Sequence, residues 1–249
     1  MKIIACIKRV PTTDLEPKIA DQKRLDPTGV VYETSFYDQI AVEAALQVKE
    51  QHGGEVTVLT IGPKDSQKEL RDALAKGADH AVLLNDEDWM NRDAHATAKA
   101  LQQKISELGA DLVFTGRVAT DRDNAAVGVM LATMMDYACV SDVVELSVDG
   151  SGGTAKREAD AGLETYSFSL PAVITCQKDL YEPRRAGLKG IMAAKKKPLD
   201  ESDAAAADNQ AQVTSLEMPP PRPEGRIVGE GAAAVDALMD ALRNEAKVL

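Results

Sequence analysis

The order of apolar runs in the first 140 residues constrains the fold most strongly. Short runs rich in β-branched residues alternate with longer segments in which apolar residues recur at helical spacing. This alternation is typical of βα units that build a parallel sheet with helices on both faces. We therefore predict an α/β fold with a doubly wound, Rossmann-like parallel sheet.

Four strands and three helices follow from this pattern. Ile40, Ala44 and Val48 recur at helical spacing in one segment, and Gly77 after Lys76 marks the end of the next helix. The predicted strands are 2–7, 55–61, 80–84 and 111–115, and the predicted helices are 37–51, 66–76 and 93–108.

The pattern changes after residue 136. Runs at 143–148 and 165–170 flank a turn-rich stretch, which predicts a small antiparallel insertion at one sheet edge. The run 171–176 has the composition of a returning central strand. Residues 199–224 are rich in Ala, Asp and Pro, which predicts an extended arm, and helical periodicity resumes at 232–248. We thus divide the chain into an α/β domain, 1–198, and a C-terminal arm with a docking helix, 199–249.

The composition argues against several classes of function. No apolar run approaches the roughly 18 residues that span a bilayer, and the N-terminal run is too short for a secretory signal. Three separated cysteines without CxxC spacing predict neither a disulfide framework nor a zinc site, and favour the reducing cytoplasm. A net charge of -11 opposes binding to nucleic acid or anionic lipid.

The motifs of common catalytic sites are missing. The sequence has no GxxxxGK[ST], no GxGxxG after the first strand and no GxSxG. Its three histidines stand apart without a carboxylate-rich cluster, so we predict no metal site and no general base. The chain is therefore not expected to be an enzyme by itself.

Ligands of open parallel sheets bind where strand ends meet helix N-termini. Four loops fit that description, beginning at Lys8, Gly62, Asn85 and Gly116. The last follows a buried strand and leads into a helix that we predict to begin near Asp123. Its backbone N–H groups could hold a phosphate, although an ordinary N-cap aspartate beside a solvated loop explains the same residues equally well.

Several segments resemble the signature region of electron transfer flavoprotein beta subunits. They are 156–164, 170–175, 182–184 and 191–198, and the likeness extends along nearly the whole chain. The resemblance implies a heterodimer in which a larger alpha subunit holds a redox-active FAD and the beta subunit holds an adenine nucleotide, commonly AMP. Electrons would pass from flavoprotein dehydrogenases, including the acyl-CoA dehydrogenases of fatty acid β-oxidation, to a membrane-associated electron transfer flavoprotein-quinone oxidoreductase.

The resemblance also assigns individual residues. Leu188, in a recognition loop at 183–194, matches an apolar side chain that enters a pocket on the dehydrogenase, and Arg184, Arg185 and Lys189 flank it. Glu158 matches an acid that helps to position the flavin domain of alpha. From spacing alone, Leu188 would rather pack on its own domain. The positions that match the AMP site are Cys6, Ser35, Phe36, Tyr37, Asp38, Ile61, Gly116, Arg117, Asp121, Asp123, Asn124, Ala125, Ala126 and Val127.

The chain departs from the family pattern in its nucleotide loop. Residues 125–127 are Ala-Ala-Val where many AMP-binding members have Asn, Gln and Thr, and Ser35 replaces a frequent Asn. Small residues here also occur in electron-bifurcating members, where a second FAD replaces AMP and NADH is oxidised. AMP is the expectation and a second FAD the alternative; a stand-alone nucleotide-binding regulator is a third reading. The run Lys195 to Lys197 fits either a solvated helix end or an electrostatic guide for an acidic partner.

Overall fold

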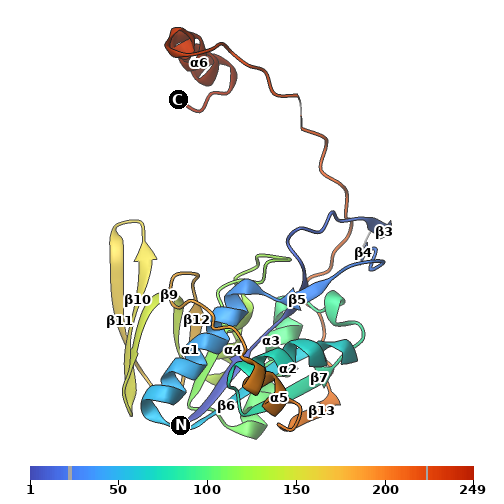
Figure 1. The fold of residues 1–249 in the computed structure, drawn as a ribbon, viewed down its shortest axis with the longest axis vertical. Helices are drawn as coiled ribbons and strands as arrows, with labels where there is room; N and C mark the ends of the chain where they lie inside the picture. Colours follow the sequence, from blue (N-terminus) through green and yellow to red (C-terminus); the bar gives the residue numbers. More distant parts are fainter. Residues whose placement is uncertain (22–23, 223) are drawn as a thin grey trace.

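A nine-stranded sheet organises the molecule in the computed structural model, which describes residues 1–21, 24–222 and 224–249. Its strands are β1 (Lys2–Cys6), β6 (Glu55–Gly62), β7 (His80–Asn85), β8 (Leu112–Gly116), β9 (Ala138–Val148), β10 (Gly152–Ala159), β11 (Gly162–Ser169), β12 (Ala172–Cys176) and β13 (Leu199–Asp203). Their order across the sheet is β11-β10-β9-β12-β8-β1-β6-β7-β13 (Figure 1). Neighbouring strands are parallel throughout the series β9-β12-β8-β1-β6-β7-β13. Strand β10, in contrast, pairs antiparallel with both β9 and β11.

Helices cover both faces of the sheet. The α-helices are α1 (Phe36–His52), α2 (Gln67–Lys76), α3 (Ala94–Leu108), α4 (Val127–Met135), α5 (Leu188–Ala194) and α6 (Val235–Asp240). Ile3 and Ala5 of β1 cluster with residues of α1 and α2, while Ile4 and Cys6 cluster with residues of α3 and α4. Successive side chains of a strand point to opposite faces, so this split confirms the doubly wound arrangement.

Short elements complete the described chain. The 3-10 turns are η1 (Lys64–Ser66), η2 (Trp89–Asn91) and η3 (Ala232–Ala234), and η4 (Ala241–Glu245) is a π-helical turn. Two small two-stranded sheets pair β2 (Arg9–Pro11) with β5 (Tyr32–Thr34) and β3 (Ile19–Asp21) with β4 (Arg24–Leu25).

The predicted elements of the first half are confirmed, with ends that move by at most one residue. Asp93 caps α3, because its side chain accepts a hydrogen bond of 2.7 Å from the backbone N–H of Ala96. Gly77 follows α2 with a positive φ of 137°, and its N–H bonds to the carbonyl of Ala73. The run after residue 171 returns as β12 between β9 and β8, as predicted.

Two strands differ from the predictions. The antiparallel insertion has three strands rather than two, because residues 152–159 form β10. Its charged residues and paired glycines hide the strand pattern; a Cβ on Gly153 would lie 2.2 Å from the carbonyl oxygen of Ser147. Residues 199–203, assigned above to the extended arm, form the edge strand β13, which pairs with β7 through its backbone while most of its polar side chains face water.

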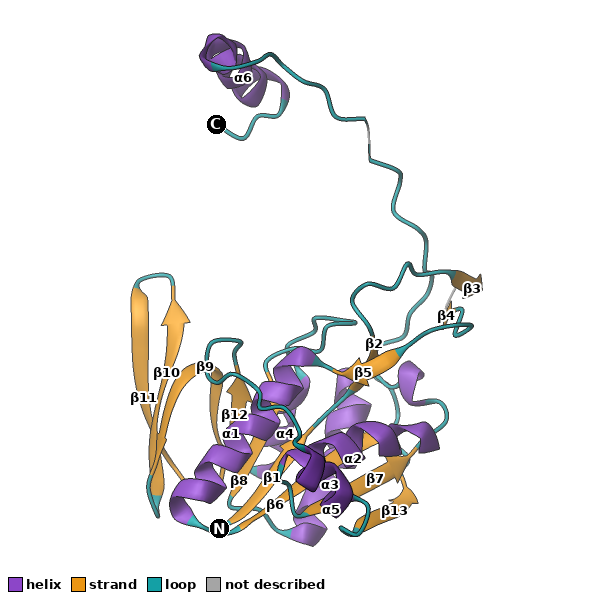
Figure 2. Cartoon of the chain, viewed as in Figure 1, coloured by secondary structure: helices purple, strands orange, loops and turns teal. Residues whose placement is uncertain are grey.

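The C-terminal region begins on the sheet and then leaves it. Backbone N–H groups of Gln210 and Ala211 donate to the Asp93 carboxylate at 2.5 and 2.8 Å, so the chain still lies against α3 at this point. An extended segment then leads away to α6 (Figures 1 and 2). Helical turns run only from 232 to 245, shorter than the predicted 232–248. Pro223, within the predicted arm, lies outside the described residues.

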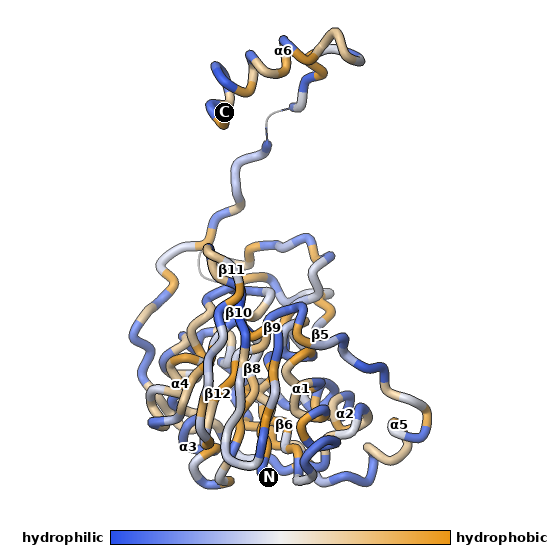
Figure 3. Tube along the Cα trace, turned by 90° about the vertical axis from the view of Figure 1, so that its left-hand side faces the viewer, coloured by the Kyte–Doolittle hydropathy of each residue, from blue (hydrophilic) through white to orange (hydrophobic). Residues whose placement is uncertain are grey.

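Apolar residues are interspersed with polar ones along this C-terminal region (Figure 3), and several of the apolar side chains are exposed. Ile227 keeps 84% of its surface exposed and Leu238 keeps 46%. In the part of the chain that is described, no helix has both the length and the hydropathy to cross a bilayer.

Candidate functional site

A cleft lies where the strand order reverses. After β1 the chain adds β6 and β7 on one side and then places β8 on the other, so the loops after β1 and β8 diverge from one point. This switch point is where doubly wound sheets bind ligands. The cleft is lined by the connection into α3 and by the loop into α4.

Asp38 joins the two strand ends that form the floor of the cleft. Its carboxylate accepts hydrogen bonds from the backbone N–H of Lys8 at 2.8 Å and of Gly116 at 2.9 Å. The side chain is buried, and burial raises the pKa of Asp38 to about 7, although both backbone bonds and the Lys8 ammonium act in the opposite direction. The first turn of α1 thus fixes the spacing of β1 and β8 from the far face of the sheet.

Lys8 connects the first loop to the loop between β8 and α4. Its ammonium contacts both carboxylate oxygens of Asp121, at 2.7 and 2.8 Å. Burial lowers the pKa of Lys8, and the neighbouring Asp121 opposes this shift. The pair places one cation and one anion at the edge of the cleft.

The helix α4 begins later than predicted, at Val127 instead of near Asp123. Asp123 and Ala125 adopt positive φ angles of 52° and 50°, which a right-handed helix cannot contain. Ala126 occupies the N-cap and has no side-chain oxygen, so no side chain caps the helix. Backbone N–H groups at this helix start are therefore available to an anion in the cleft.

Two glycines let the backbone approach closely here. A Cβ on Gly116 would lie 2.5 Å from Oδ1 of Asp38, and one on Gly128 would lie 2.5 Å from Oγ1 of Thr115. Gly128 therefore allows the first turn of α4 to sit directly on the ends of the strands.

Arginines from two loops add positive charge. Arg92 pairs with Asp86 and donates to the carbonyl of Ala205 at 3.0 Å, yet its Nη1 is buried without a hydrogen-bond partner among the described residues. Arg122 donates to the carbonyls of Arg92 and Met90, which ties the two loops together. Arg117 pairs with Asp142. A buried guanidinium nitrogen without a partner fits a site for an anionic or strongly hydrogen-bonding ligand.

The cleft collects ten of the fourteen residues predicted for the nucleotide: Cys6, Asp38, Ile61, Gly116, Arg117, Asp121, Asn124, Ala125, Ala126 and Val127. The other four do not line it. Ser35 is buried at the start of α1 and Phe36 is exposed, whereas Tyr37 packs behind Gly116. Asp123 is exposed on the loop, because its backbone turns there.

Another group of lining residues was not predicted individually. Trp89, Met90, Arg92 and Asp93 come from the connection between β7 and α3, and Ala94, Thr97 and Leu101 come from α3 itself. The loop after Asn85 was among the four indicated by sheet topology. Nothing in its local sequence distinguishes these residues, which only the tertiary fold brings to the cleft.

The predicted partner-binding residues lie away from the cleft. Leu188 begins α5 with 78% of its surface exposed, so the alternative that it packs on its own domain is wrong. Arg185 and Lys189 are exposed beside it, and Glu158 is exposed on β10. Arg184, in contrast, forms ion pairs with Glu43 and Glu50 of the same chain.

The three lysines after α5 differ in their contacts. Lys195 and Lys196 are exposed. The Lys197 ammonium donates to the carbonyls of Leu74 and Ala78, at the end of α2, and burial lowers its pKa. Lys197 therefore stabilises a helix end.

Groups suited to nucleophilic or metal chemistry are scarce. All three cysteines are free thiols; Cys6 and Cys176 are buried, and burial raises the pKa of both, which disfavours the reactive thiolate. Across residues 1–21, 24–222 and 224–249, no three His, Cys, Asp or Glu side chains gather closely enough to hold a metal ion.

Comparison with known proteins identifies the family. The electron transfer flavoprotein domain matches residues 25–207. The electron transfer flavoprotein subunit beta of Bacillus subtilis (strain 168) is 35% identical over 259 aligned positions, and the one from Bradyrhizobium diazoefficiens is 36% identical over 255; both alignments cover the full length of both chains. Subunit CarD of the caffeyl-CoA reductase-Etf complex of Acetobacterium woodii is 35% identical over 204 positions, covering 80% of this chain and 77% of that one. The chain therefore belongs to the electron transfer flavoprotein beta-subunit family.

Proposed function

We propose that this chain is the beta subunit of a heterodimeric electron transfer flavoprotein, with an adenine nucleotide in its cleft and α5 as its docking surface for dehydrogenases. The cleft at the switch point is the observation that carries this proposal, because its lining combines apolar side chains with hydrogen-bond donors, as a base and a phosphate require. Ile61, Trp89 and Leu101 offer an apolar wall for a base. The uncapped start of α4, with Lys8 and Arg92 nearby, offers donors for a phosphate.

The alpha subunit would hold the redox-active FAD, which supplies the electron-carrying chemistry of the complex. This chain would contribute no reacting group. Its tasks would be to stabilise the heterodimer through the C-terminal region and to bring donor dehydrogenases, such as those of fatty acid β-oxidation, close to the flavin. Delivery of electrons to a quinone oxidoreductase would follow, and the three free thiols fit a cytoplasmic location.

AMP is the nucleotide that we propose. Residues 125–127 offer only small or apolar side chains, so the phosphate would depend on backbone N–H groups at Ala126 to Gly128 and on the neighbouring cations. The same small residues, together with the relative from a caffeyl-CoA reductase-Etf complex, favour a second candidate. In that case the cleft would hold a second FAD and the complex would carry out electron bifurcation with NADH.

The two candidates predict different cofactor contents. This chain would be coexpressed with its alpha partner, and flavin and AMP released from the purified complex on denaturation would be measured separately. One FAD and one AMP per heterodimer would support the simple carrier. Two FAD without AMP would establish the bifurcating alternative, and one FAD without AMP would refute the proposed use of the cleft.

A further inference from the structure

The helix α5 is too short to hold its own conformation. It spans seven residues, and no side chain caps its N-terminus at Gly187. Isolated helices of this length are unstable in water. Leu188, Ile191 and Met192 nevertheless form one apolar stripe, with 78, 46 and 58% of their surfaces exposed. Contacts on the other side of α5 must therefore hold this stripe in place.

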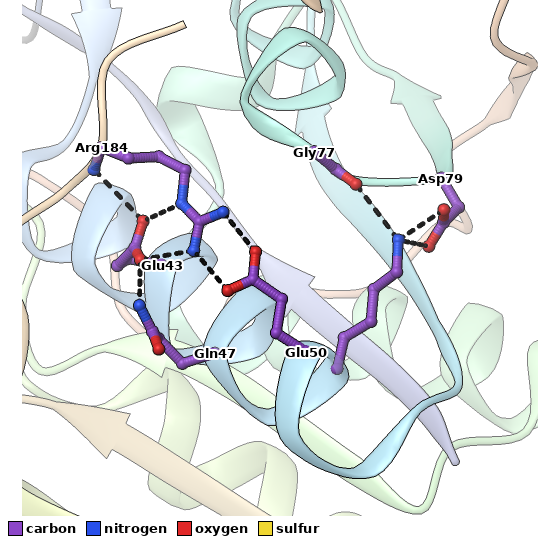
Figure 4. A network of polar contacts seen from close by, with 7 residues as sticks. Glu43, Gln47, Glu50, Gly77, Asp79 and Arg184 are labelled. Carbon is purple, nitrogen blue, oxygen red and sulfur yellow. Dashed lines mark hydrogen bonds and ion pairs between the residues drawn. The ribbon is translucent and has the colours of Figure 1, made fainter.

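The first set of contacts joins the chain before α5 to α1. The guanidinium of Arg184 donates to both oxygens of Glu43 at 2.8 Å, and the backbone N–H of Arg184 donates to Glu43 at 3.1 Å (Figure 4). The same guanidinium contacts Glu50 at 2.5 and 3.2 Å, and Gln47 donates to Glu43 at 2.8 Å. Bidentate pairs of this kind fix orientation as well as distance.

The two carboxylates of this network differ in burial. Glu43 is only 4% exposed, and although burial raises its pKa, hydrogen bonds from Arg184 and Gln47 produce a net lowering. Glu50 lies at the surface. Glu43 is thus inaccessible to a partner protein, so any influence that it has on docking must pass through Arg184.

The second set of contacts joins α5 to α2. A Cβ on Gly190 would lie 2.2 Å from the carbonyl oxygen of Ala75, so the two helices touch backbone to backbone there. Arg71 donates to the carbonyls of Ala194 and Lys197, at 2.6 and 2.7 Å. Lys197 donates in return to carbonyls at the end of α2. Arg71 of α2 and Lys197 after α5 therefore satisfy free carbonyls at the ends of the opposite helices.

We propose that Arg184 and Arg71 are positioning residues that hold α5 in the orientation needed for docking. The inference rests on the proposed docking role of α5, and it gives Arg184 a different task from direct contact with a dehydrogenase. A docking element that is already ordered loses less conformational freedom on binding, so loosening it should weaken the complex. The chemistry of electron transfer should not change, because neither arginine approaches the cleft.

The test measures reduction of the heterodimer by a flavoprotein acyl-CoA dehydrogenase in four variants. Glu43→Gln and Arg184→Gln should each raise KM for the heterodimer about five- to tenfold, with kcat, FAD content and reduction by dithionite unchanged. Glu107→Gln, which breaks an ion pair on α3 across the sheet, is the matched control and should leave KM unchanged. Leu188→Ala should raise KM whether or not the positioning contacts matter.

Each of the other possible results shows which part of the proposal is wrong. If Arg184→Gln raises KM but Glu43→Gln does not, Arg184 contacts the dehydrogenase directly and the positioning role is wrong. If only Leu188→Ala raises KM, α5 docks without needing these contacts. An unchanged KM in Leu188→Ala would refute the docking function itself. If Glu43→Gln does not fold, Arg71→Gln takes its place, because it removes the contacts that hold the end of α5 from α2. A raised KM with unchanged FAD content would support the positioning role, and an unchanged KM would refute it.

Discussion

The cleft and the C-terminal region differ in whether their side chains find partners within the chain. In the cleft, charged groups find partners within the chain: Asp38 bonds to the backbone of two loops, and Lys8 pairs with Asp121. In the C-terminal region, Ile227 and Leu238 remain exposed although the same residue types are buried throughout the sheet. Contacts within the chain thus hold the groups of the cleft, whereas the exposed apolar side chains of the C-terminal region are of the kind that another protein surface covers.

The largest expected effect is on the affinity of this chain for the alpha subunit. Leu238→Asp should weaken the heterodimer more than about a hundredfold, because a charge would replace an apolar side chain at the interface that we propose with the alpha subunit. The unfolding free energy of the isolated chain should remain unchanged, since Leu238 is exposed in the isolated chain. Sedimentation of mixed subunits and urea unfolding of the single chain would measure the two quantities.

Ala237→Asp is the matched control for this change. It adds the same charge one position earlier, about 100° around the helix. If both variants weaken the heterodimer equally, charge repulsion rather than loss of an apolar contact explains the effect. Equal affinity in Leu238→Asp and the natural chain would show that the C-terminal region does not bind alpha.

A change in the cleft should instead alter the unfolding free energy of the isolated chain, because the contacts of Asp38 lie within this chain. Burial raises the pKa of Asp38 from 3.8 to about 7. Below pH 3.8 both folded and unfolded chains are protonated at this position; between 3.8 and about 7 only the folded chain keeps the proton. Ionisation of Asp38 should therefore cost stability as pH rises through this range, and the cost should be constant above it.

Asp38→Asn removes this titration and makes the effect measurable. The difference in unfolding free energy between the natural chain and the variant should change by about 2–4 kcal/mol from pH 4.5 to pH 8, in the direction that favours the natural chain at low pH. Urea unfolding at both pH values gives the difference. A difference independent of pH would show that Asp38 titrates normally despite its burial.

A smaller effect is expected from Lys8→Gln. The ion pair with Asp121 is partly exposed to water, so its loss should change the unfolding free energy by less than about 1 kcal/mol. Hydrogen exchange in residues 117–126 should nevertheless become faster, because this loop loses its contact with the loop after β1. Unchanged exchange in this loop would mean that Arg122 and Asp38 hold it without help.

The sequence predicted the sheet well because its strands are buried on both faces and its helices show regular spacing. It failed at β10 and β13, whose charged or polar side chains lie near the sheet edges, where backbone pairing stabilises a strand without an apolar pattern. The start of α4 was also misplaced. Asp123 has the composition of an N-cap, but its left-handed backbone delays the helix by four residues.

Only part of the candidate site was predicted, because local sequence patterns do not reveal tertiary contacts. The loop at Gly116 follows a recognisable strand and was found, whereas Arg92 and Trp89 reach the cleft only through the tertiary path of the connection after β7. The ion pair of Arg184 with Glu43 joins residues 141 positions apart. No local pattern could indicate that contact, and it changes the role inferred for Arg184.

The most direct test of the account adds a negative charge at the start of α4. Ala126→Glu should leave the fold intact, since an acidic residue suits a helix N-terminus, but should exclude a phosphate from the same N–H groups. In the purified heterodimer we predict at least a tenfold lower AMP content with FAD and dehydrogenase KM retained, while the neutral control Ala126→Gln keeps its AMP. Normal AMP content in Ala126→Glu would contradict the assignment of the cleft as the nucleotide site.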